Sequence, residues 1–335
     1  MSTVNRQVLL TARPDAIPQA EHFTVVEGVI PEPGDGEVLV KNQFLSVDPA
    51  MRGWVSAVAN YSEPVALDSV MRSIAVGEVV ASNNANIPTG TLLCGMFGWQ
   101  EYAIANDDNI WFPHDPAAGP ASLSLGILGL NGITAYFGLL EAGTPKQGET
   151  VVVSTAAGAV GSAVGQIAKI KGCHTVGITS TVEKQRQCRE EFGFDAAVSY
   201  REGDLSAALG DACPEGVDVY FDNTGGAISD TVYQQLNVGA RVVICGTAAN
   251  SSWSPWPTGD RMERHILTKR ATVRGILAFD WADEYDRARA ELSTWVQQGK
   301  LSYREDFLNG IDAAPGSIAR LYAGENQGKL MVRLT

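Results

Sequence analysis

A glycine-containing turn in the middle of the chain has the spacing of a dinucleotide-binding site. Residues 154–161 read STAAGAVG and stand between an apolar run and a helix-like stretch. In the pattern G-x-G-x-x-G, Ala156 takes the first glycine position, and Gly158 and Gly161 take the other two. A small residue permits the first tight turn, the second glycine lets a pyrophosphate approach the backbone, and the third lets helix and strand pack closely. The turn therefore predicts a dinucleotide site, although a purely structural strand-turn-helix also uses small residues.

The residues that follow the next predicted strand indicate which dinucleotide is bound. An NAD site usually has an acidic residue at the end of that strand, where it accepts hydrogen bonds from the ribose hydroxyls. Here the strand ends in GITST, residues 177–181, and the nearest acid, Glu183, has capping-box spacing to Ser180. Lys184 follows, and Tyr200 closes the third predicted strand; a cation and hydroxyls suit a 2′-phosphate. This favours NADP, the alternative being that Lys184 is an exposed lysine without a ligand.

Strand-like and helix-like segments alternate around this turn. The strand-like segments read ETVVVST, HTVGITS, AAVSY, VDVYFDNTGG, ARVVICGT and TVRGILAFD. Such alternation predicts βαβ units, a parallel sheet and helices on both faces. We therefore predict a doubly wound cofactor domain over residues 127–299, ending in a helix over 283–298.

The first part of the chain has a different texture. Residues 1–126 contain short apolar runs separated by Gly, Pro, Asn and Asp, which is typical of a largely β domain with many turns. The tail ends in KLMVRL, a strand-like segment that we expect to return to the sheet of the first domain. We therefore predict a catalytic, substrate-binding domain from 1–126 together with 300–335, which fits a chain of 335 residues at roughly 150 residues per domain.

The charge balance argues against several classes of partner. Lys and Arg number 25 against 38 Asp and Glu, a net charge of −13, which repels phosphate backbones and anionic membranes. We expect no nucleic-acid partner and no membrane partner. No run approaches the roughly 20 apolar residues that span a bilayer, so we expect a soluble, cytoplasmic protein. The five cysteines are widely spaced and odd in number, which favours reduced core thiols over disulfides.

Several chemistries lack their residues. A zinc site needs clustered Cys and His ligands, but the chain has no C-x-x-C and its four histidines stand far apart in sequence. We interpret each histidine as a surface or packing residue and predict no metal. A G-x-S-x-G hydrolase elbow and a Tyr-x-x-x-Lys pair are also missing from the sequence. Hydride transfer without a metal is the chemistry that remains.

A set of motifs in one order resembles a known family over nearly the whole chain. The motifs are LSVDPAMRG (45–53), GWQEYA (98–103), GLNGITAYFGLLEAG (129–143), STAAGAVGSAVGQ (154–166), VDVYFDNTGG (217–226) and NQGKLMVRL (326–334). They are similar to the zinc-independent medium-chain dehydrogenases/reductases. Among these, they resemble the NADPH-dependent alkenal/one reductases, which include prostaglandin and leukotriene reductases, plant double-bond reductases and bacterial curcumin reductases.

The resemblance implies an α/β protein with a mostly β, GroES-like catalytic domain and a Rossmann doubly wound cofactor domain. It implies reduction of the carbon–carbon double bond of an α,β-unsaturated ketone or aldehyde, with hydride passing from NADPH to the β-carbon, and a homodimer. The positions matched to the cofactor are Gly158, Ala159, Val160, Gly161, Lys184, Tyr200, Asn223, Cys245, Gly246, Thr247, Ser251, Ile276, Leu277, Ala278 and Asn326. From the residues alone, Asn223 and Asn326 are equally well explained as turn formers.

Two departures from the family pattern affect the proton donor. Ala50 stands where the family's DPYMRG has a tyrosine, and Ser251 stands at the position of a second pocket tyrosine. Tyr61 remains as a matched phenol, either the catalytic donor or a loop aromatic packed at the rim. Trp253 and Trp256 follow the cofactor-bordering segment, and we interpret them as a lid over the pocket or as dimer-contact residues.

Two other functions remain open from the sequence. A quinone oxidoreductase on the same fold would need no positioned proton donor. A cofactor-binding protein without turnover is the second alternative, because Ala50 and Ser251 remove two phenols. Measuring NADPH consumption with an enone and with a quinone separates these functions.

Overall fold

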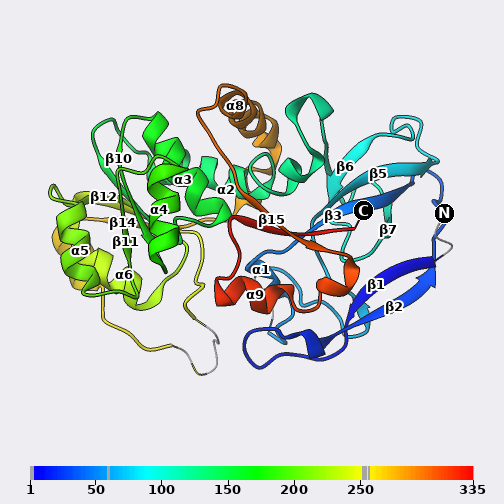
Figure 1. The fold of residues 1–335 in the computed structure, drawn as a ribbon, viewed down its shortest axis with the longest axis horizontal. Helices are drawn as coiled ribbons and strands as arrows, with labels where there is room; N and C mark the ends of the chain where they lie inside the picture. The colour runs from blue at the N-terminus through cyan, green and yellow to red at the C-terminus, as the bar shows by residue number, and fades with distance from the viewer. Residues whose placement is uncertain (1–3, 59–60, 251–254, 256, 335) are drawn as a thin grey trace. The chain divides into compact units, whose positions relative to one another are not determined.

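The chain divides into two compact units, each with its own core. The computed structural model describes residues 4–58, 61–250, 255 and 257–334. One unit comprises Met1–Leu125 and Glu305–Thr335, and the other comprises Gly126–Arg304. Figure 1 colours the chain by residue number, so that the first unit contains both the blue and the red ends.

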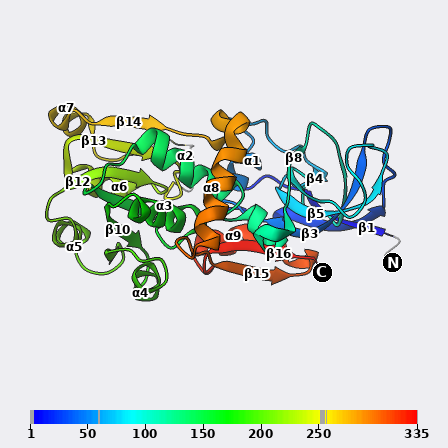
Figure 2. The ribbon, with the colours of Figure 1, turned by 90° about the horizontal axis from the view of Figure 1, so that it is seen from above.

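The second unit is built on a parallel sheet of six strands in the order β11-β10-β9-β12-β13-β14. The strands are β9 (Thr150–Ser154), β10 (His174–Thr179), β11 (Ala196–Ser199), β12 (Val217–Asp222), β13 (Leu236–Ile244) and β14 (Thr272–Gly275). Figure 2 shows β14 beyond β13, at the edge of the sheet. The strand order reverses between β9 and β12, and doubly wound sheets bind ligands at such a switch point. The predicted doubly wound fold is confirmed.

Helices cover both faces of this sheet. They are α2 (Leu130–Phe137), the π-helical η4 (Gly138–Gly143), α3 (Ala159–Ile170), α4 (Val182–Glu190), α5 (Leu205–Ala212), α6 (Gly226–Tyr233), α7 (Glu263–Lys269), the 3-10 helix η5 (Ala278–Glu284) and α8 (Tyr285–Gln297). Val152 of β9 packs in one core cluster with Leu209 of α5 and Val232 of α6. Its neighbours Val151 and Val153 point to the opposite face because successive side chains of a strand alternate. Both residues are buried there.

The predicted helix over 283–298 begins two residues later than expected. The regular helix α8 begins at Tyr285, after the N-cap residue Glu284 with φ −113° and ψ 8°, and the preceding η5 contains a kink at Trp281 with φ −119° and ψ 26°. The indole of Trp281 stacks on Phe137 with ring centroids 5.2 Å apart, and the guanidinium of Arg274 lies 5.7 Å from its ring centre. These contacts fix the kink, and only the folded chain brings their residues together.

The first unit is mostly β. A sheet in the order β2-β1-β4 accompanies a seven-stranded sheet in which β15-β16-β3-β5-β6-β8 form the path and β7 pairs with β3. The strands are β1 (Val4–Leu10), β2 (Phe23–Val29), β3 (Val38–Ser46), β4 (Ser69–Val70), β5 (Ala75–Ser82), β6 (Leu92–Gly95), β7 (Tyr102–Ala105), β8 (Ile110–Pro113), β15 (Glu305–Asn309) and β16 (Lys329–Arg333). The helices are η1 (Ala20–His22), α1 (Ala50–Trp54), η2 (Pro116–Ala118), η3 (Ala121–Leu125), η6 (Ile311–Ala313) and α9 (Ser317–Ala323).

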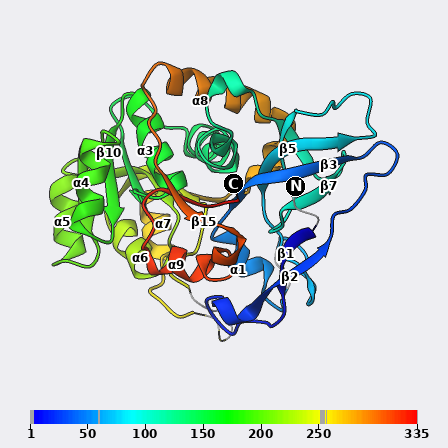
Figure 3. The ribbon, with the colours of Figure 1, turned by 45° about the vertical axis from the view of Figure 1, so that its right-hand side comes forward.

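The C-terminal tail completes the larger sheet of this unit. Figure 3 shows β3 beside β5, and on its other side β3 pairs with β16, with Met331 opposite Ser46. The prediction that KLMVRL returns to the first sheet is confirmed. Antiparallel pairing places the start of β16 next to the end of β3, from which the chain continues into α1.

A buried ion pair holds the turn between β3 and α1. The ammonium group of Lys329 donates to Asp48 Oδ1 at 2.6 Å, to Ser46 Oγ at 2.6 Å and to the carbonyl of Val47 at 3.1 Å. The Lys329 side chain is only 4% exposed, and a buried ammonium is tolerated when its donors are satisfied. The pair thereby fixes the backbone that leads into Ala50, the first residue of α1.

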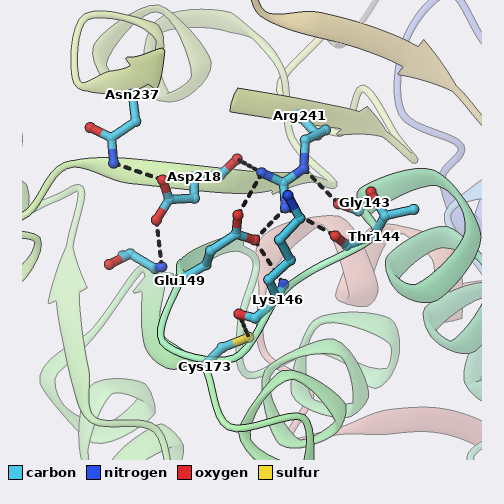
Figure 4. A network of polar contacts seen from close by, with 9 residues as sticks. Gly143, Thr144, Lys146, Glu149, Cys173, Asp218, Asn237 and Arg241 are labelled. Carbon is cyan, nitrogen blue, oxygen red and sulfur yellow. Dashed lines mark hydrogen bonds and ion pairs between the residues drawn. The ribbon is translucent and has the colours of Figure 1, made fainter. Parts of the chain in front are cut away.

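A second polar network closes the amino ends of the parallel strands (Figure 4). Arg241 of β13 forms an ion pair with Glu149 and donates to the carbonyls of Gly143 at 2.9 Å and Thr144 at 3.0 Å. Burial acts to raise the pKa of Glu149, but hydrogen bonds from Arg241 and the backbone outweigh it, so that its pKa is lowered. Beside it, Asp218 accepts the Thr150 amide at 2.9 Å and the Asn237 side-chain amide at 2.8 Å. The network ties the end of η4 to the sheet.

Candidate functional site

The glycine turn between β9 and α3 accommodates Ala156 because the neighbouring strand carries a glycine. Ala156 is fully buried, and a Cβ placed on Gly177 of β10 would lie 2.7 Å from the Ala156 Cβ. The missing side chain of Gly177 therefore leaves room for the Ala156 methyl group at the first motif position. Gly161 is required in its own place, because a Cβ there would lie 2.3 Å from the carbonyl oxygen of Thr155.

The start of α3 has the features of an anion site. Gly158 is the N-cap residue, with extended angles of φ −81° and ψ 173°, and it has no side chain with which to cap the helix. The first N–H groups of a helix lack intrahelical acceptors, and together with the helix dipole they bind phosphate groups. Gly158, Ala159, Val160 and Gly161 therefore fit the pyrophosphate of a dinucleotide.

Three further predicted cofactor segments follow the adjacent strands β12, β13 and β14. Because these strands are parallel, their carboxyl ends lie along one edge of the sheet with the glycine turn. The Asn223 amide nitrogen donates to Ser154 Oγ at 2.8 Å, and its side chain donates to the Ser154 carbonyl at 2.8 Å. The Cys245 amide donates to the Asp222 carbonyl at 2.8 Å, and the Ile276 amide donates to the last carbonyl of β13 at 3.1 Å. The structure thus brings these segments together.

The side chains in these segments have defined limits. The Asn223 side-chain amide donates to the Ser154 carbonyl, so one of its donors joins the turn after β12 to the end of β9. Gly246 lies so close to Asn223 that a Cβ on it would be 2.9 Å from the Asn223 carbonyl oxygen. Burial and the charge of Asp222 raise the pKa of the Cys245 thiol to about 12, so this thiol is protonated and is no nucleophile. Thr247, Leu277 and Ala278 lie in the same two segments, after β13 and β14.

The structure corrects the assignment of the cap at α4. The capping-box spacing predicted that Glu183 caps the helix with Ser180 as its partner, but the N-cap is Thr181, whose Oγ1 accepts the amide of Lys184 at 3.2 Å. The helix begins one residue later than that pattern places it, so Glu183 lies in the first turn. There its negative charge interacts favourably with the positive end of the helix dipole.

Two cations, Lys184 in α4 and Arg201 after β11, lie close enough to affect one another. Burial lowers the pKa of Lys184, and the positive charge of Arg201 lowers it further. The guanidinium of Arg201 lies over the Tyr200 ring, 5.6 Å from its centre, and the Tyr200 side chain is 40% exposed. Lys184 and Tyr200 are therefore placed near a second cation that the sequence motif did not identify. Its signal in the sequence was its position directly after Tyr200.

The first unit contains the other two assigned residues. Asn326 is buried, and its side chain donates to the Gly328 carbonyl at 2.7 Å, as a turn former does. Tyr61 lies in the loop after α1 and is 48% exposed. Ser251, Trp253 and Trp256 lie outside the described residues.

Tyr61 is close to a second phenol on the C-terminal helix. Burial raises the pKa of Tyr322, the charge of Arg52 lowers it, and Tyr61 raises it. The Tyr322 hydroxyl donates to the Pro49 carbonyl at 3.0 Å, and the Arg52 guanidinium lies 5.0 Å from the Tyr322 ring centre. Ala50 follows Pro49 in the chain, so the Tyr322 hydroxyl lies next to the start of α1.

The buried histidine His114 has a structural role. His114 is buried, with Nδ1 2.8 Å from Ser124 Oγ and Nε2 3.0 Å from the Gly119 carbonyl oxygen. Both ring nitrogens are occupied within the core. In the part of the chain that the structure describes, no group of three or more His, Cys, Asp or Glu residues is arranged to hold a metal ion. Within the same ranges, no helix combines the length and apolar character needed to cross a membrane.

Comparisons with known proteins place the chain in a family. A family model described as "N-terminal domain of oxidoreductase" matches residues 6–112, and one described as "Zinc-binding dehydrogenase" matches residues 159–294. The chain is 39% identical to the NADPH-dependent curcumin reductase of Escherichia coli, over 98% of this chain and 97% of that protein. It is 36% identical to the NADP(+)-dependent 2-alkenal reductase of Nicotiana tabacum, over 99% and 98%. The chain belongs to the NADPH-dependent alkenal/one reductases of the medium-chain dehydrogenase/reductase superfamily.

A solved member of this family supports the fold. CurA from Vibrio vulnificus in complex with NADPH matches with a TM-score of 0.93 and 38% identity, over 98% of this chain and 99% of that chain. The predicted family and the predicted combination of a mostly β domain with a Rossmann domain are therefore confirmed.

One residue at this edge of the sheet escaped the motif analysis. Asp222 ends β12 and is only 3% exposed, although its carboxylate lies directly before the Asn-Thr-Gly-Gly turn. The signal in the sequence was an acidic residue closing the apolar strand VDVYFD. Its hydrogen bonds include one from Ser154, which is distant in the sequence, so the motif alone could not identify them.

Proposed function

We propose that this chain catalyses the NADPH-dependent reduction of the carbon–carbon double bond of α,β-unsaturated ketones and aldehydes. The observation that carries the proposal is a glycine turn at the switch point of a Rossmann sheet, in a chain related over its full length to a curcumin reductase and a 2-alkenal reductase. We assign the unit Gly126–Arg304 to the cofactor and the other unit to the substrate.

Bound NADPH supplies the hydride for the β-carbon, so the protein must accommodate the negative charge that develops on the carbonyl oxygen. A donor placed at that oxygen stabilises the transition state more than the ground state. We assign this role to Tyr61, whose phenol is half-exposed, while the neighbouring Tyr322 hydroxyl is engaged by the Pro49 carbonyl. The α-carbon then takes a proton from Tyr61 or from water.

A panel of enones, enals and quinones with product identification tests the reaction class. We expect NADPH to be consumed with enones and enals and the products to be the saturated carbonyl compounds. Preferential reduction of quinones would favour a quinone oxidoreductase, and NADPH binding without turnover of any compound would favour a cofactor-binding protein.

Tyr61→Phe tests the donor assignment. The variant should retain NADPH affinity and lower kcat with enones about a hundredfold, the typical effect of one lost donor, while quinone reduction falls less. Tyr322→Phe is the matched control, since it removes a hydroxyl that is already bonded to backbone. Wild-type kcat for Tyr61→Phe would remove Tyr61 from the mechanism.

We propose that Lys184, Tyr200 and Arg201 together bind the 2′-phosphate of NADP. Burial lowers the pKa of Lys184 and the charge of Arg201 lowers it further, so an anion between the two cations would relieve their repulsion. The guanidinium adds a planar donor that matches phosphate oxygens. Double substitution of Lys184 and Arg201 by Ala should remove the preference for NADPH over NADH in binding titrations.

We propose further that catalysis needs no metal and that the protein is a cytoplasmic homodimer. Activity should survive dialysis against a strong chelator, and recovery by added zinc after loss would contradict this.

The strand β14 ends the sheet, and Leu267 on the neighbouring α7 is 76% exposed, which suits association with a second copy. Light scattering tests the dimer, and cell fractionation tests the location, which the prediction of reduced thiols supports.

A further inference from the structure

The carboxylate of Asp222 gathers hydrogen bonds from both sides of the predicted cofactor turns. Its Oδ1 accepts from Ser154 Oγ at 3.1 Å, from the Tyr220 hydroxyl at 2.9 Å, and from the amides of Thr224 and Gly225 at 2.9 Å each, while its Oδ2 accepts from Ser229 Oγ. Each of these donors is neutral. Asp222, Ser154, Tyr220 and Ser229 are all more than nine-tenths buried, so the carboxylate replaces water for these three side-chain donors.

These contacts join the ends of three strands. Ser154 is the last residue of β9, and its hydroxyl donates to Asp222 while it accepts the amide of Asn223 at 2.8 Å. The carbonyl of Asp222 accepts the amides of Cys245 at 2.8 Å and Gly246 at 3.1 Å, which follow β13. One residue thereby connects the glycine turn after β9 with the turns after β12 and β13.

The turn after β12 needs such an anchor. Gly225 and Gly226 have positive φ angles of 71° and 62°, which glycine adopts readily. Two adjacent glycines also give the unfolded chain many other conformations, so this turn costs conformational entropy to order. Asp222 holds this turn through the amides of Thr224 and Gly225. Burial and the charge of Asp222 raise the pKa of Tyr220 well above its usual value, so its hydroxyl remains a donor to the carboxylate.

We propose that Asp222 is a positioning residue for the cofactor, which sets the turns after β9, β12 and β13 in their binding conformation through its contacts with Ser154, Thr224 and Gly225. The inference rests on the proposed cofactor site along this edge. Asp222 itself faces its protein donors, and its effect on the cofactor is transmitted through the backbone that it holds.

The experiment compares two aspartates on the same strand. Asp218 lies at the amino end of β12, where it accepts the Thr150 amide and the Asn237 side chain. Asp218→Ala and Asp222→Ala should both lower the unfolding midpoint. Only Asp222→Ala should weaken NADPH binding, by about tenfold or more, because donors left without an acceptor release the turns. The readouts are thermal unfolding and the Kd of NADPH by calorimetry.

A conservative variant provides the rescue. Asp222→Asn keeps an oxygen at Oδ1 for its donors and can donate to Ser229 Oγ, so its NADPH Kd should return to within about threefold of wild type. If Asp222→Ala does not fold, Ser154→Ala removes the hydroxyl that donates to Asp222 and accepts the Asn223 amide, and it should weaken NADPH binding severalfold.

Two results would overturn the inference. One is unchanged NADPH affinity in Asp222→Ala, or in Ser154→Ala should the first variant not fold. The other is equal weakening in Asp218→Ala. Failure of the wild-type protein to bind NADPH would instead defeat the proposed cofactor site, and the inference with it.

Discussion

The two ends of the parallel sheet use buried polar side chains in opposite ways. At the amino ends, Arg241 and Glu149 neutralise each other, and the remaining guanidinium donors cap the carbonyls of Gly143 and Thr144 (Figure 4). At the carboxyl ends, Asp222 is surrounded by neutral hydroxyls and backbone amides. The amino-end network closes on itself, whereas Asp222 shapes turns beside the uncapped start of α3. The polar contacts at the amino ends stabilise the fold, whereas those at the carboxyl ends hold the turns that are predicted to bind the cofactor.

The largest expected effect comes from filling the glycine turn. Gly161→Val would place its Cβ 2.3 Å from the Thr155 carbonyl oxygen, so the backbone must move and the helix start no longer faces the pyrophosphate. NADPH affinity should fall about a hundredfold or more, as measured by calorimetry. Gly210→Val in α5 is the control, because a Cβ on Gly210 meets nothing within 4 Å. NADPH binding by Gly161→Val at wild-type strength would dissociate the turn from the cofactor.

Breaking the amino-end network should separate stability from binding. Arg241→Met leaves the Glu149 carboxylate and the Gly143 and Thr144 carbonyls without their donor, and partly buried acceptors left unpaired cost about 1 to 3 kcal/mol. Urea unfolding should show this decrease, while the Kd of NADPH stays at the wild-type value. A change in Kd as large as the change in the free energy of unfolding would show that the two ends are not independent.

The cofactor preference should depend on one lysine at the carboxyl end of the sheet. A charge-assisted contact with phosphate contributes about 1.5 to 3 kcal/mol, or roughly tenfold to a hundredfold in affinity. Lys184→Ala should therefore weaken NADPH binding by that factor and leave NADH binding nearly unchanged. Lys169→Ala is the control, since Lys169 on α3 pairs with Asp195. Equal losses for both cofactors would assign Lys184 another role.

The smallest effect is a pH dependence confined to the amino end. Because the folded-state pKa of Glu149 lies below its unfolded value, the stability it contributes is present above the unfolded pKa and is lost as the pH falls through the folded one. The stability difference between wild type and Arg241→Met should therefore shrink between about pH 5 and pH 3, by about 1 kcal/mol or less because the pair is partly exposed. Urea unfolding over this range measures it. A difference that stays constant would contradict the lowered pKa.

The reach of sequence reasoning differs between these regions. The alternation of strand-like and helix-like segments and the spacing of the glycines are local patterns. The doubly wound fold and the turn at 154–161 could therefore be predicted. Lys184 was found through its distance from the second strand. Arg201 and Asp222 were missed, because their significance depends on neighbours that are distant in sequence, such as Lys184 and Ser154. The assignments of Tyr61 and the cofactor residues stay predictions until they are tested.

The sequence by itself determined the family, the order of strands and helices and the glycine turn, because each depends on residue types at short, fixed spacings. Only the tertiary structure decided why Ala156 is tolerated, since the space comes from Gly177 on another strand. It likewise decided the kink at Trp281 in η5, since the Trp281 ring contacts Phe137 and Arg274. Contacts of this kind join residues whose separation along the chain carries no periodic signal, so they follow from packing and hydrogen-bond satisfaction in the folded molecule.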